Sequence, residues 1–396
     1  MNIVLFDDPV IRLDLMPFTL TRPVAEVRLG ILTIREKWEK FFGQPISHFT
    51  QDYLQVKFPL ITGKDNVAIN GAVCPDEILM KAIQGLDTGE SLVSGNTMIA
   101  ARTPEIPSLH HLKLKQVQFQ GMITLIDQVW KIFQHNALQI KSDFQLLTRG
   151  RKSLKIEDLH TRTYSPENIF VEEGATIQAA VLNASTGPIY IGRRAQILEG
   201  ALIRGPFALG EESVVNMGAK VKGDSTVGPH CKVGGEISNS VFFGYSNKAH
   251  DGFLGNSVIG EWCNLGADTN VSNLKNNYDS VKLWNFPTRK FQSTGLTFCG
   301  LMMGDHSKCG INTMFNTGTM TGVSANIFGD GYPRNFIPSF AWGGAAGFTT
   351  FQLDKAYETA TRVMGRRGQS FTDGDKKIMK TVFESTAPER VWEKMS

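Results

Sequence analysis

The sequence has few cysteines, no long apolar run and almost no excess of charge of either sign. The cysteines include no CxxC pair and suggest no disulfide framework. No apolar stretch approaches the ~20 residues that a membrane helix needs. A net charge of +3 over 396 residues is too small to indicate binding to nucleic acid or to an anionic membrane. We therefore expect buried, apolar cysteines in a reducing compartment, at positions Cys74, Cys231, Cys263, Cys299 and Cys309.

The first residues, MNIVLFDDPVIRLDLMPF, contain two early aspartates and no basic segment ahead of an apolar core. This is not the pattern of a secretory signal peptide, so we expect a cytoplasmic protein. A chain of this length is too long for one compact core and predicts two or three domains. Glycine is enriched, with 39 residues, and the repeat in the middle of the chain accounts for much of that excess.

Aliphatic residues recur every six positions in the middle of the chain. The period runs without a slip through eight consecutive positions, resumes after a gap, and resumes again near residue 303. Glycine follows several of these residues. The positions are Ile191, Ile197, Ile203, Leu209, Val215, Val221, Val227 and Val233, then Ile259, Leu265 and Val271, then Met303, Cys309, Phe315, Thr321 and Ile327.

A period of six fits neither a helix nor an ordinary amphipathic strand. It fits a triangular prism in which each coil has three short strands and each strand points one aliphatic residue inward. The sequence therefore predicts a left-handed parallel β-helix of hexapeptide repeats over residues 166–345. We expect glycine to permit the unfavourable backbone conformation at the corners. Because such a prism has flat faces and open ends, we also expect a homotrimer.

The period is broken twice, at about residues 234–253 and 273–297. Both segments are polar and rich in asparagine. We expect loops to leave the prism at these breaks, and loops on a rigid scaffold are favoured positions for functional residues.

The two ends of the chain follow other patterns. Residues 1–165 alternate short apolar strands (3–6, 67–70, 91–93) with helices (31–42, 77–83, 124–133), which predicts an α/β domain. Residues 346–396 have apolar positions at helical spacing and predict a helical tail, packed on the end of the prism or on a neighbouring subunit.

The segment HDGFLGNSVIGEWCNLGADTNVSN, residues 250–273, closely resembles a signature of a known enzyme family. The family is that of the bifunctional N-acetylglucosamine-1-phosphate uridyltransferase/glucosamine-1-phosphate acetyltransferases. The signature combines a histidine, an aromatic-Leu-Gly, an Ile-Gly, an Asn-Leu-Gly-Ala-x-Thr and a final asparagine. Here it ends in Asn-Leu-Lys, which looks more like the archaeal type of these enzymes than the bacterial one.

The resemblance implies acetyl transfer from acetyl-CoA to glucosamine 1-phosphate, with His250 as the general base. A neutral histidine suits that role, because it can take a proton from an ammonium group near pH 7. By the same resemblance Asn264 and Asn273 would bind the sugar or the base, and Lys220 and Lys222 would contact a phosphate; solvated lysines at an edge are an equally good interpretation of the last two. A small polar side chain such as Ser272 could meet the oxyanion.

This sequence departs from the family pattern at two positions of that site. Phe253 stands where the family has a tyrosine, so one hydroxyl contact is lost. Ser238 stands where the family has a lysine. These differences affect the details of the substrate more than the class of reaction.

The segment LTRPVAEVRLGILTIREKW resembles a variant sugar nucleotidyltransferase domain found fused to hexapeptide repeats in bifunctional proteins of the Bacteroidetes type. This resemblance implies transfer from UTP or dTTP to a sugar phosphate with Mg²⁺, giving UDP-N-acetylglucosamine, a precursor of the cell wall. Triphosphate-binding candidates are Arg12, Arg22, Arg28 and Lys37, since guanidinium forks suit phosphates; surface arginines beside a helix are the alternative.

The metal site of this domain is not defined by the sequence. The glycine-rich loop of ordinary nucleotidyltransferases is missing, and Asn70-Gly71-Ala72 replaces the usual Asn-Gly-Asp that holds Mg²⁺. Asp7 and Asp8 are weak substitutes for the lost carboxylate.

Two alternatives remain. A zinc enzyme of the γ-carbonic anhydrase type would need three clustered histidines, but the repeats contain only His230, His250 and His306, and none form a close pair in sequence. A degenerate sugar-nucleotide-binding module, with the β-helix serving assembly, would explain Ala72; an acetyltransferase with an inactive N-terminal domain is a variant of this idea.

Overall fold

The computed structural model describes residues 1–394, and its internal contacts divide the chain into two compact units. The first unit comprises Met1–Val27 and Leu32–Gln128. The second comprises Arg28–Ile31 and the chain from Val129 onward. Among the residues described, no helix has the length and apolar character needed to cross a membrane.

The first unit is an α/β domain, as predicted. Its six-stranded sheet has the order β2-β1-β3-β6-β5-β7, with β1 parallel to both neighbours and β6 antiparallel to both of its own. The strands are β1 (Asn2–Phe6), β2 (Ser47–Phe49), β3 (Asn66–Asn70), β5 (Glu90–Ser94), β6 (Thr97–Thr103) and β7 (Lys115–Gln118). The helices are α1 (Pro9–Asp14), α2 (Ile34–Phe42), α3 (Asp52–Gln55) and α4 (Glu77–Gln84), with short 3-10 turns at η1 (Phe18–Leu20), η2 (Val24–Glu26) and η3 (Leu109–His111).

The helix predicted over residues 124–133 is wrong in its first half. Thr124–Leu125 forms strand β8, which pairs antiparallel with β4 (Val73–Cys74). The helix, α5, covers only Val129–Gln134. Pairing with β4 satisfies the backbone of this segment, so tertiary contact overrides the local helical pattern.

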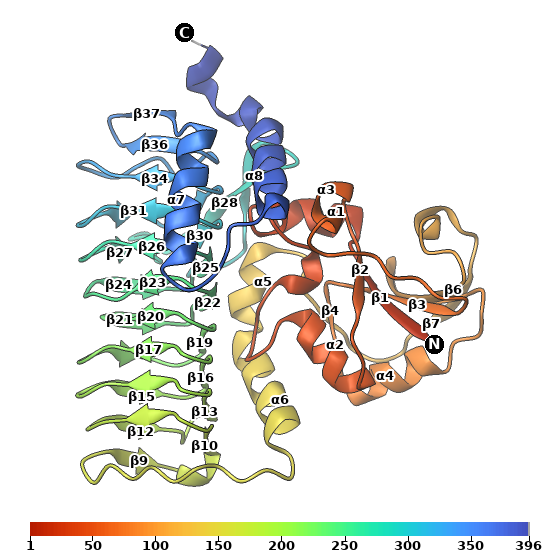
Figure 1. The fold of residues 1–396 in the computed structure, drawn as a ribbon, viewed down its shortest axis with the longest axis horizontal. Helices are drawn as coiled ribbons and strands as arrows, with labels where there is room; N and C mark the ends of the chain where they lie inside the picture. The colour runs from red at the N-terminus through yellow and green to blue at the C-terminus, as the bar shows by residue number, and fades with distance from the viewer. Residues whose placement is uncertain (395–396) are drawn as a thin grey trace. The chain divides into compact units, whose positions relative to one another are not determined.

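The second unit is a parallel β-helix, which confirms the predicted scaffold (Figure 1). Its strands form three sheets, here named faces A, B and C. Face A contains β10 (Ile169–Val171), β13 (Ile189–Ile191), β16 (Phe207–Leu209), β19 (Ser225–Val227), β22 (Val241–Gly244), β25 (Val258–Glu261), β30 (Leu301–Met303), β33 (Thr319–Thr321) and β35 (Phe336–Ile337).

Face B contains β11 (Thr176–Ile177), β14 (Gln196–Ile197), β17 (Val214–Val215), β20 (Lys232–Val233), β23 (Asn247–Lys248), β26 (Asn264–Leu265), β31 (Lys308–Cys309), β34 (Asn326–Ile327), β36 (Ala341–Gly344) and β37 (Gly347–Thr350). Face C contains β9 (Arg162–Tyr164), β12 (Val181–Asn183), β15 (Leu202–Arg204), β18 (Lys220–Val221), β21 (Glu236–Ser238) and β24 (Phe253–Gly255), and β24 contacts the pair β27 (Asn270–Val271) and β32 (Met314–Phe315).

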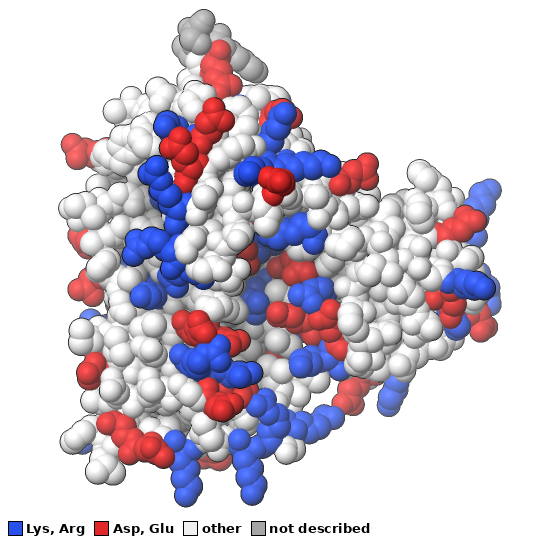
Figure 2. Space-filling model, viewed as in Figure 1, with Lys and Arg blue, Asp and Glu red and all other residues white. Residues whose placement is uncertain are grey.

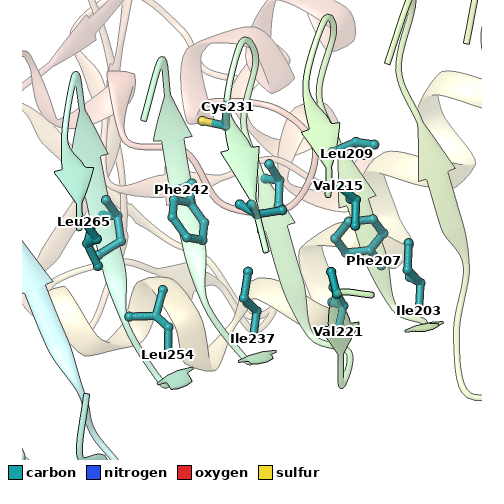
Figure 3. Packing of buried hydrophobic residues seen from close by; sticks show 14 of the residues in the cluster. Ile203, Phe207, Leu209, Val215, Val221, Cys231, Ile237, Phe242, Leu254 and Leu265 are labelled. Carbon is teal, nitrogen blue, oxygen red and sulfur yellow. The ribbon is translucent and has the colours of Figure 1, made fainter. Parts of the chain in front are cut away.

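The residues of the six-residue period fill the interior of the prism. Side chains from the three faces point toward one another in successive coils, and nearly all are buried (Figure 3). This single stacked core is the reason the repeat is visible in the sequence: each inward position touches its equivalent one coil away. Cys231, Cys263 and Cys309 belong to this core, and all five cysteines are free and buried.

The glycines of the repeat are needed for a different reason from the one expected. A Cβ on Gly228 would lie 2.0 Å from the carbonyl oxygen of Phe243, and one on Gly210 would lie 2.6 Å from a backbone nitrogen. The left-handed backbone falls two residues later, on Glu212 and His230, with φ of 54° and 57°. These glycines therefore allow close approach between coils, and non-glycine residues carry the corner strain.

Of the two breaks in the period, only the second is a loop that leaves the prism. Between residues 234 and 253 the coils continue: the inward residues Ile237 and Phe242 follow at spacings of four and five, and Lys248 and Leu254 then follow at six. The expectation of a loop there is wrong, because shorter corners preserve the strand pairing. The second break forms an antiparallel hairpin, β28 (Lys282–Asn285) and β29 (Lys290–Ser293).

Helices cover part of the β-helix within the same unit. α5 and α6 (Asn136–Thr148) contact strands of face A. The predicted boundary at residue 165 therefore differs from the division by contacts, which assigns both helices to the second unit. The short helix η4 (Pro166–Asn168) precedes β10.

The tail consists of α7 (Leu353–Gly365), α8 (Asp373–Ser385), η5 (Ala387–Glu389) and η6 (Val391–Lys394). It packs on its own prism: Arg367 donates hydrogen bonds to the His230 carbonyl and to Asn247 Oδ1, both at 3.0 Å. Phe383 of α8 contacts Phe340 edge to face at 4.9 Å. α8 begins at a capping box formed by Thr372 and Asp375.

Candidate functional site

His250 lies on an exposed corner of the β-helix, between β23 of face B and β24 of face C. The corner is tight: Gly252 has a φ of +111°, and a Cβ there would lie 2.2 Å from the Thr269 carbonyl oxygen. Only glycine fits this position, so the His-Asp-Gly sequence directs the chain around the corner and leaves the imidazole in solvent.

Lys248 supports this corner from inside the prism. Its side chain is 1% exposed and takes the inward position that Val233 has in the preceding coil. The ammonium donates hydrogen bonds to the carbonyls of His250 (2.7 Å) and Asp251 (3.1 Å), and more weakly to Gly234 (3.4 Å). Burial lowers the pKa of Lys248 to about 8. The sequence analysis missed this residue, because a lysine at an inward position gives no periodic signal.

The two predicted asparagines lie on either side of His250 along the coil. Asn264 is on face B, in register with Asn247, and the two amides are 3.5 Å apart. Asn273 follows β27 and donates from Nδ2 to Asn256 Oδ1 at 2.8 Å. Asn256 follows β24 whereas His250 precedes it, so Asn273 and His250 lie at opposite ends of that strand.

Lys220 and Lys222 lie on face C, two strands from β24 in the order β24-β21-β18. Lys222 forms an ion pair with Glu236 at 2.6 Å, and Lys220 is exposed. Both line a shallow cavity of about 550 Å³ with Asn183 and Arg204. This cavity extends along face C through β12, β15 and β18, which lie beyond β21 from the His250 corner.

Two serines of the predicted site, Ser272 and Ser238, have defined neighbours. The hydroxyl of Ser272 is 2.7 Å from Thr317 Oγ1, so a protein partner already engages it. Ser238, at the position of the missing lysine, is in register with Gly255 on face C.

The three histidines of the repeats are not brought together. His230 and His306 belong to a stack of corner side chains between faces A and B, in which His230, Tyr245, Trp262 and His306 follow one another with ring planes within 15°. His250 lies at the corner between faces B and C. Among the side chains that the structure describes, no group of three or more His, Cys, Asp or Glu could hold a metal ion. Within residues 1–394 of one chain, the three histidines required by the carbonic anhydrase alternative therefore do not form a cluster.

In the first unit, Asp7 and Arg12 meet in a buried network at the end of β1. Asp7 accepts hydrogen bonds from Thr50 Oγ1 (2.5 Å) and the Val24 amide (2.8 Å), and Arg12 Nε is 3.7 Å from its carboxylate. Arg12 also donates to the Thr19 carbonyl and to Tyr53 Oη, at 3.0 and 2.7 Å. Burial raises the pKa of Asp7, and the hydrogen bond from Thr50 only partly opposes this.

The other candidates of the first domain are dispersed. Arg22 and Lys37 are buried, with exposed fractions of 5% and 1%. Arg28 belongs to the second unit, where it donates to the carbonyls of Phe243 (2.9 Å) and Ile31 (2.6 Å). Arg28, one of the four cations predicted to bind triphosphate, thus donates its hydrogen bonds to backbone carbonyls of the second unit.

The predicted carboxylates do not fit a magnesium site. Both oxygens of Asp7 already accept hydrogen bonds. Asp8 caps α1, accepting from the amides of Val10 and Ile11 at 2.9 and 3.1 Å. Asn70 donates to the Met98 carbonyl and accepts from the Ala72 amide.

Sequence reasoning also missed Glu26 and His48 of the first unit. Glu26 Oε1 is 2.9 Å from His48 Nε2 and 2.5 Å from Arg35 Nε. Burial alone would raise the pKa of Glu26, but these two partners outweigh it and hold the pKa at about 2. Glu26 lies in the LTRPVAEVRLG segment, so the motif includes this residue, but it gives no sign of its partner His48.

Comparison with known proteins places the end of the N-terminal domain later than the internal contacts do, since the family match runs to residue 152 and the first unit ends at Gln128. Residues 3–152 match the model of the sugar nucleotidyl transferase family, so the chain has a nucleotidyltransferase-like N-terminal domain followed by a β-helix. The bifunctional protein GlmU of Trichodesmium erythraeum is 33% identical over 95 residues, covering 24% of this chain and 19% of that protein. The bifunctional protein GlmU of Methanocaldococcus jannaschii is 32% identical over 92 residues, covering 23% and 22%.

The bifunctional sugar-1-phosphate nucleotidylyltransferase/acetyltransferase of Sulfurisphaera tokodaii is 33% identical over 93 residues, covering 24% of this chain and 23% of that protein. These matches confirm the resemblance inferred from the motif, and they span about a fifth of each relative's length. The structure of the polySia-specific acetyltransferase NeuO matches with a TM-score of 0.26 and 12% identity, covering 50% of this chain and 86% of that one; a likeness this low carries no functional information.

Proposed function

We propose that the β-helix unit transfers the acetyl group of acetyl-CoA to the amino nitrogen of glucosamine 1-phosphate, with His250 as the general base. The observation that supports this is the exposed imidazole of His250 on a glycine-dependent corner that Lys248 fixes from inside. A base held on a rigid element and open to solvent is what proton removal from a bound ammonium requires.

In the proposed reaction, His250 takes one proton from the ammonium of the amino sugar. The freed nitrogen attacks the thioester carbonyl carbon, and a tetrahedral oxyanion forms. Collapse of the oxyanion breaks the carbon–sulfur bond and expels the thiolate of coenzyme A. The nitrogen passes its second proton to the thiolate and His250 releases the first to solvent, so the products are the N-acetyl sugar phosphate, the free thiol and one proton. Asn264 and Asn273 are the proposed sugar- or base-binding residues, and Lys220 and Lys222 the proposed phosphate contacts.

The experiment measures thiol release from acetyl-CoA with glucosamine 1-phosphate. The wild-type chain should release thiol, and His250→Ala should lower kcat by about 10²–10⁴. His160→Ala is the matched control, since it removes another exposed histidine of the same unit outside the motif. Unchanged release in His250→Ala would show that His250 is not the base.

For the N-terminal domain, we propose uridylyl transfer from UTP to N-acetylglucosamine 1-phosphate, so that the two activities together make UDP-N-acetylglucosamine. The match of residues 3–152 supports this proposal. The test is pyrophosphate release from UTP, and from dTTP in parallel, with Arg22→Ala as the variant expected to lower it. Release unchanged by Arg22→Ala would remove that residue from the triphosphate site.

One observation favours the alternative that this domain binds a sugar nucleotide without catalysis. The carboxylates available for a metal are engaged within the protein, as described for Asp7 and Asp8. Thiol release without pyrophosphate release would identify an acetyltransferase with an inactive N-terminal domain. Release of neither product, with nucleotide binding retained, would identify a binding module.

A further inference from the structure

A cavity of about 1080 Å³ lies at the C-terminal end of the β-helix in the second unit. The β28–β29 hairpin, the end of face A at β35, the β36–β37 turn and the tail helices η5 and η6 form its walls. Its lining includes none of His250, Asn264 and Asn273. The volume is at the upper end of the range for sites that enclose a small organic ligand.

Aromatic rings form one wall of this cavity. Trp284 stacks on Phe336 with ring centroids 4.3 Å apart and planes within 11°. Phe291 meets Trp284 edge to face at 5.4 Å. The indole Nε1 of Trp284 is buried and has no hydrogen-bond partner among the residues the structure describes. A buried donor without a partner is costly, so a ligand acceptor at this wall would be stabilising.

Positive charge dominates the rest of the lining. Four cations, Lys275, Lys282, Arg289 and Arg334, face one acid, Glu389. Lys275 donates to the Ser280 carbonyl at 2.8 Å, but Lys282, Arg289 and Arg334 form no ion pair within residues 1–394. Oε2 of Glu389 is buried and lacks a partner in the same part of the chain. Four cations against a single carboxylate give the lining an excess of positive charge, which favours an anionic ligand.

Aromatic wall and cations together narrow the class of ligand. A simple anion would leave the aromatic wall unused, and a purely apolar molecule would leave the cations unused. A flat heterocycle stacks well on tryptophan and phenylalanine, and its ring oxygens or nitrogens can accept from an indole. Guanidinium groups bind phosphate through paired hydrogen bonds.

We propose that this cavity binds a nucleoside phosphate, with the heterocycle against Trp284 and the phosphates against Arg289 and Arg334. The group can come from a nucleoside diphosphate sugar or from the adenosine end of coenzyme A, and the same contacts serve both. A nucleoside diphosphate sugar in this cavity would go beyond the reactions proposed above, whereas coenzyme A would be the acetyl donor, so that part of the inference rests on the proposed acetyl transfer.

The test is calorimetric titration of the full-length chain with UDP-N-acetylglucosamine, with coenzyme A and with orthophosphate. Arg289→Ala/Arg334→Ala should weaken binding of one nucleotide by at least about tenfold, the loss expected for two phosphate contacts. Lys290→Ala, an exposed lysine of the same hairpin outside the cavity lining, should bind within about twofold of wild type. Trp284→Leu should also weaken nucleotide binding, but should not change binding of orthophosphate.

The first domain is itself proposed to bind a nucleotide sugar, so the titration with UDP-N-acetylglucosamine is decided by stoichiometry. The cavity variants should lose one bound equivalent that wild type and Lys290→Ala retain. His250→Ala should bind as wild type does, so failure of acetyl transfer leaves this proposal open to test. The ligand whose binding is weakened in the cavity variants, UDP-N-acetylglucosamine or coenzyme A, identifies the source of the nucleotide. Equal nucleotide binding in the cavity variants and the Lys290→Ala control would overturn the proposal. Binding of an acidic peptide, with no binding of either nucleotide, would also overturn it.

Discussion

At the scale of single residues, Lys248 shows how an ionisable side chain can occupy the interior of a β-helix. The preceding coil has Val233 at this position, and Asn264 pairs with Asn247 in the next, which places Leu265 beside Lys248. The aliphatic stem of the lysine packs as those residues do, and backbone carbonyls receive its ammonium. Through this one side chain, the packing of the core helps to fix the backbone position of His250.

Replacing Lys248 by methionine should change how stability depends on pH. Burial lowers the pKa of Lys248 to about 8 in the folded chain, whereas an unfolded lysine has a pKa of about 10.4. Between these values the unfolded chain binds more protons, so this residue makes stability rise with pH. The free energy of unfolding of wild type should therefore increase, relative to that of Lys248→Met, by up to about 3 kcal/mol from pH 8 to 10.5.

Urea unfolding at several pH values measures this shift. Comparing each variant with wild type at the same pH cancels the titration of the buried cysteines and of Lys308. Lys232→Met, which replaces an exposed lysine of face B, should give a difference that does not vary with pH. A pH-independent difference for Lys248→Met would contradict the assigned burial.

Glu389 should make nucleotide binding in the proposed cavity depend on pH. Burial raises the pKa of Glu389 to about 7, while the nearby charges of Arg289 and Arg390 lower it. Above that pH the carboxylate is charged and repels phosphate, so affinity should fall between pH 6 and 8, and Glu389→Gln should bind tightly at both. Calorimetry at the two pH values tests this; an equal fall in the variant would assign the effect elsewhere. The other charged groups facing the cavity are Lys275, Lys282 and Arg334.

At the scale of structural elements, buried serines connect successive coils at the corners. Ser246 Oγ donates to the Gly260 carbonyl at 2.7 Å and accepts from the Cys263 amide at 2.9 Å. Ser213 makes the same pair of bonds two coils earlier in that corner, donating to the Gly228 carbonyl and accepting from the Cys231 amide. A second row at another corner contains Ser225, Ser240 and Ser257.

Ser246→Ala should destabilise the second unit by about 1–3 kcal/mol, since it leaves a buried amide and a buried carbonyl without this partner. Ser185→Ala removes an exposed serine of the same unit and should stay within about 0.5 kcal/mol of wild type. Denaturant midpoints for the two variants give the comparison. Equal midpoints would mean that water or a shifted backbone replaces the serine bonds.

The repeat predicted the β-helix because each inward aliphatic residue meets its equivalent in the next coil. It failed between Val233 and Phe242, where two corners are shorter and strand pairing persists, and again at Lys248, where the inward residue six positions later is not aliphatic. The serine rows were not predicted either, because a buried serine with two backbone partners looks like any polar residue in the sequence.

The motif located the His250 corner but not its geometry. Spacing along the chain cannot show that Asn273 follows the coil to the far end of β24. In the first domain, Arg28 was grouped with Arg12 by sequence, yet its guanidinium binds the carbonyl of Phe243, 215 residues away. Long-range contacts of this kind have no local signal, and the roles of these residues stay predictions.

At the scale of the whole molecule, the charge distribution limits the classes of partner. On the face of the second unit seen in Figure 2, basic and acidic side chains are intermixed over the coils. Ion pairs such as Arg194 with Glu211 and Glu212 account for part of this mixing. An intermixed surface has a weak long-range field, so we continue to expect no nucleic-acid partner.

The faces of the prism differ in what covers them within the second unit. α5 and α6 contact face A, and the tail reaches the corner between faces A and B at His230. Face C has apolar side chains in solvent: Leu202 is 49% exposed and Met314 is 36% exposed. Exposed apolar side chains on a regular sheet are typical of surfaces that associate.

We therefore predict a homotrimer that buries face C against neighbouring copies. Sedimentation equilibrium should give three times the 43.8 kDa of one chain. Leu202→Glu should shift the protein toward monomer, because it places a charge where the contact excludes water. Leu138→Glu, the same change at an exposed position of α6, should leave the mass unchanged. A monomeric wild type would contradict the assembly, and a trimer unaffected by Leu202→Glu would mean that another surface than face C forms it.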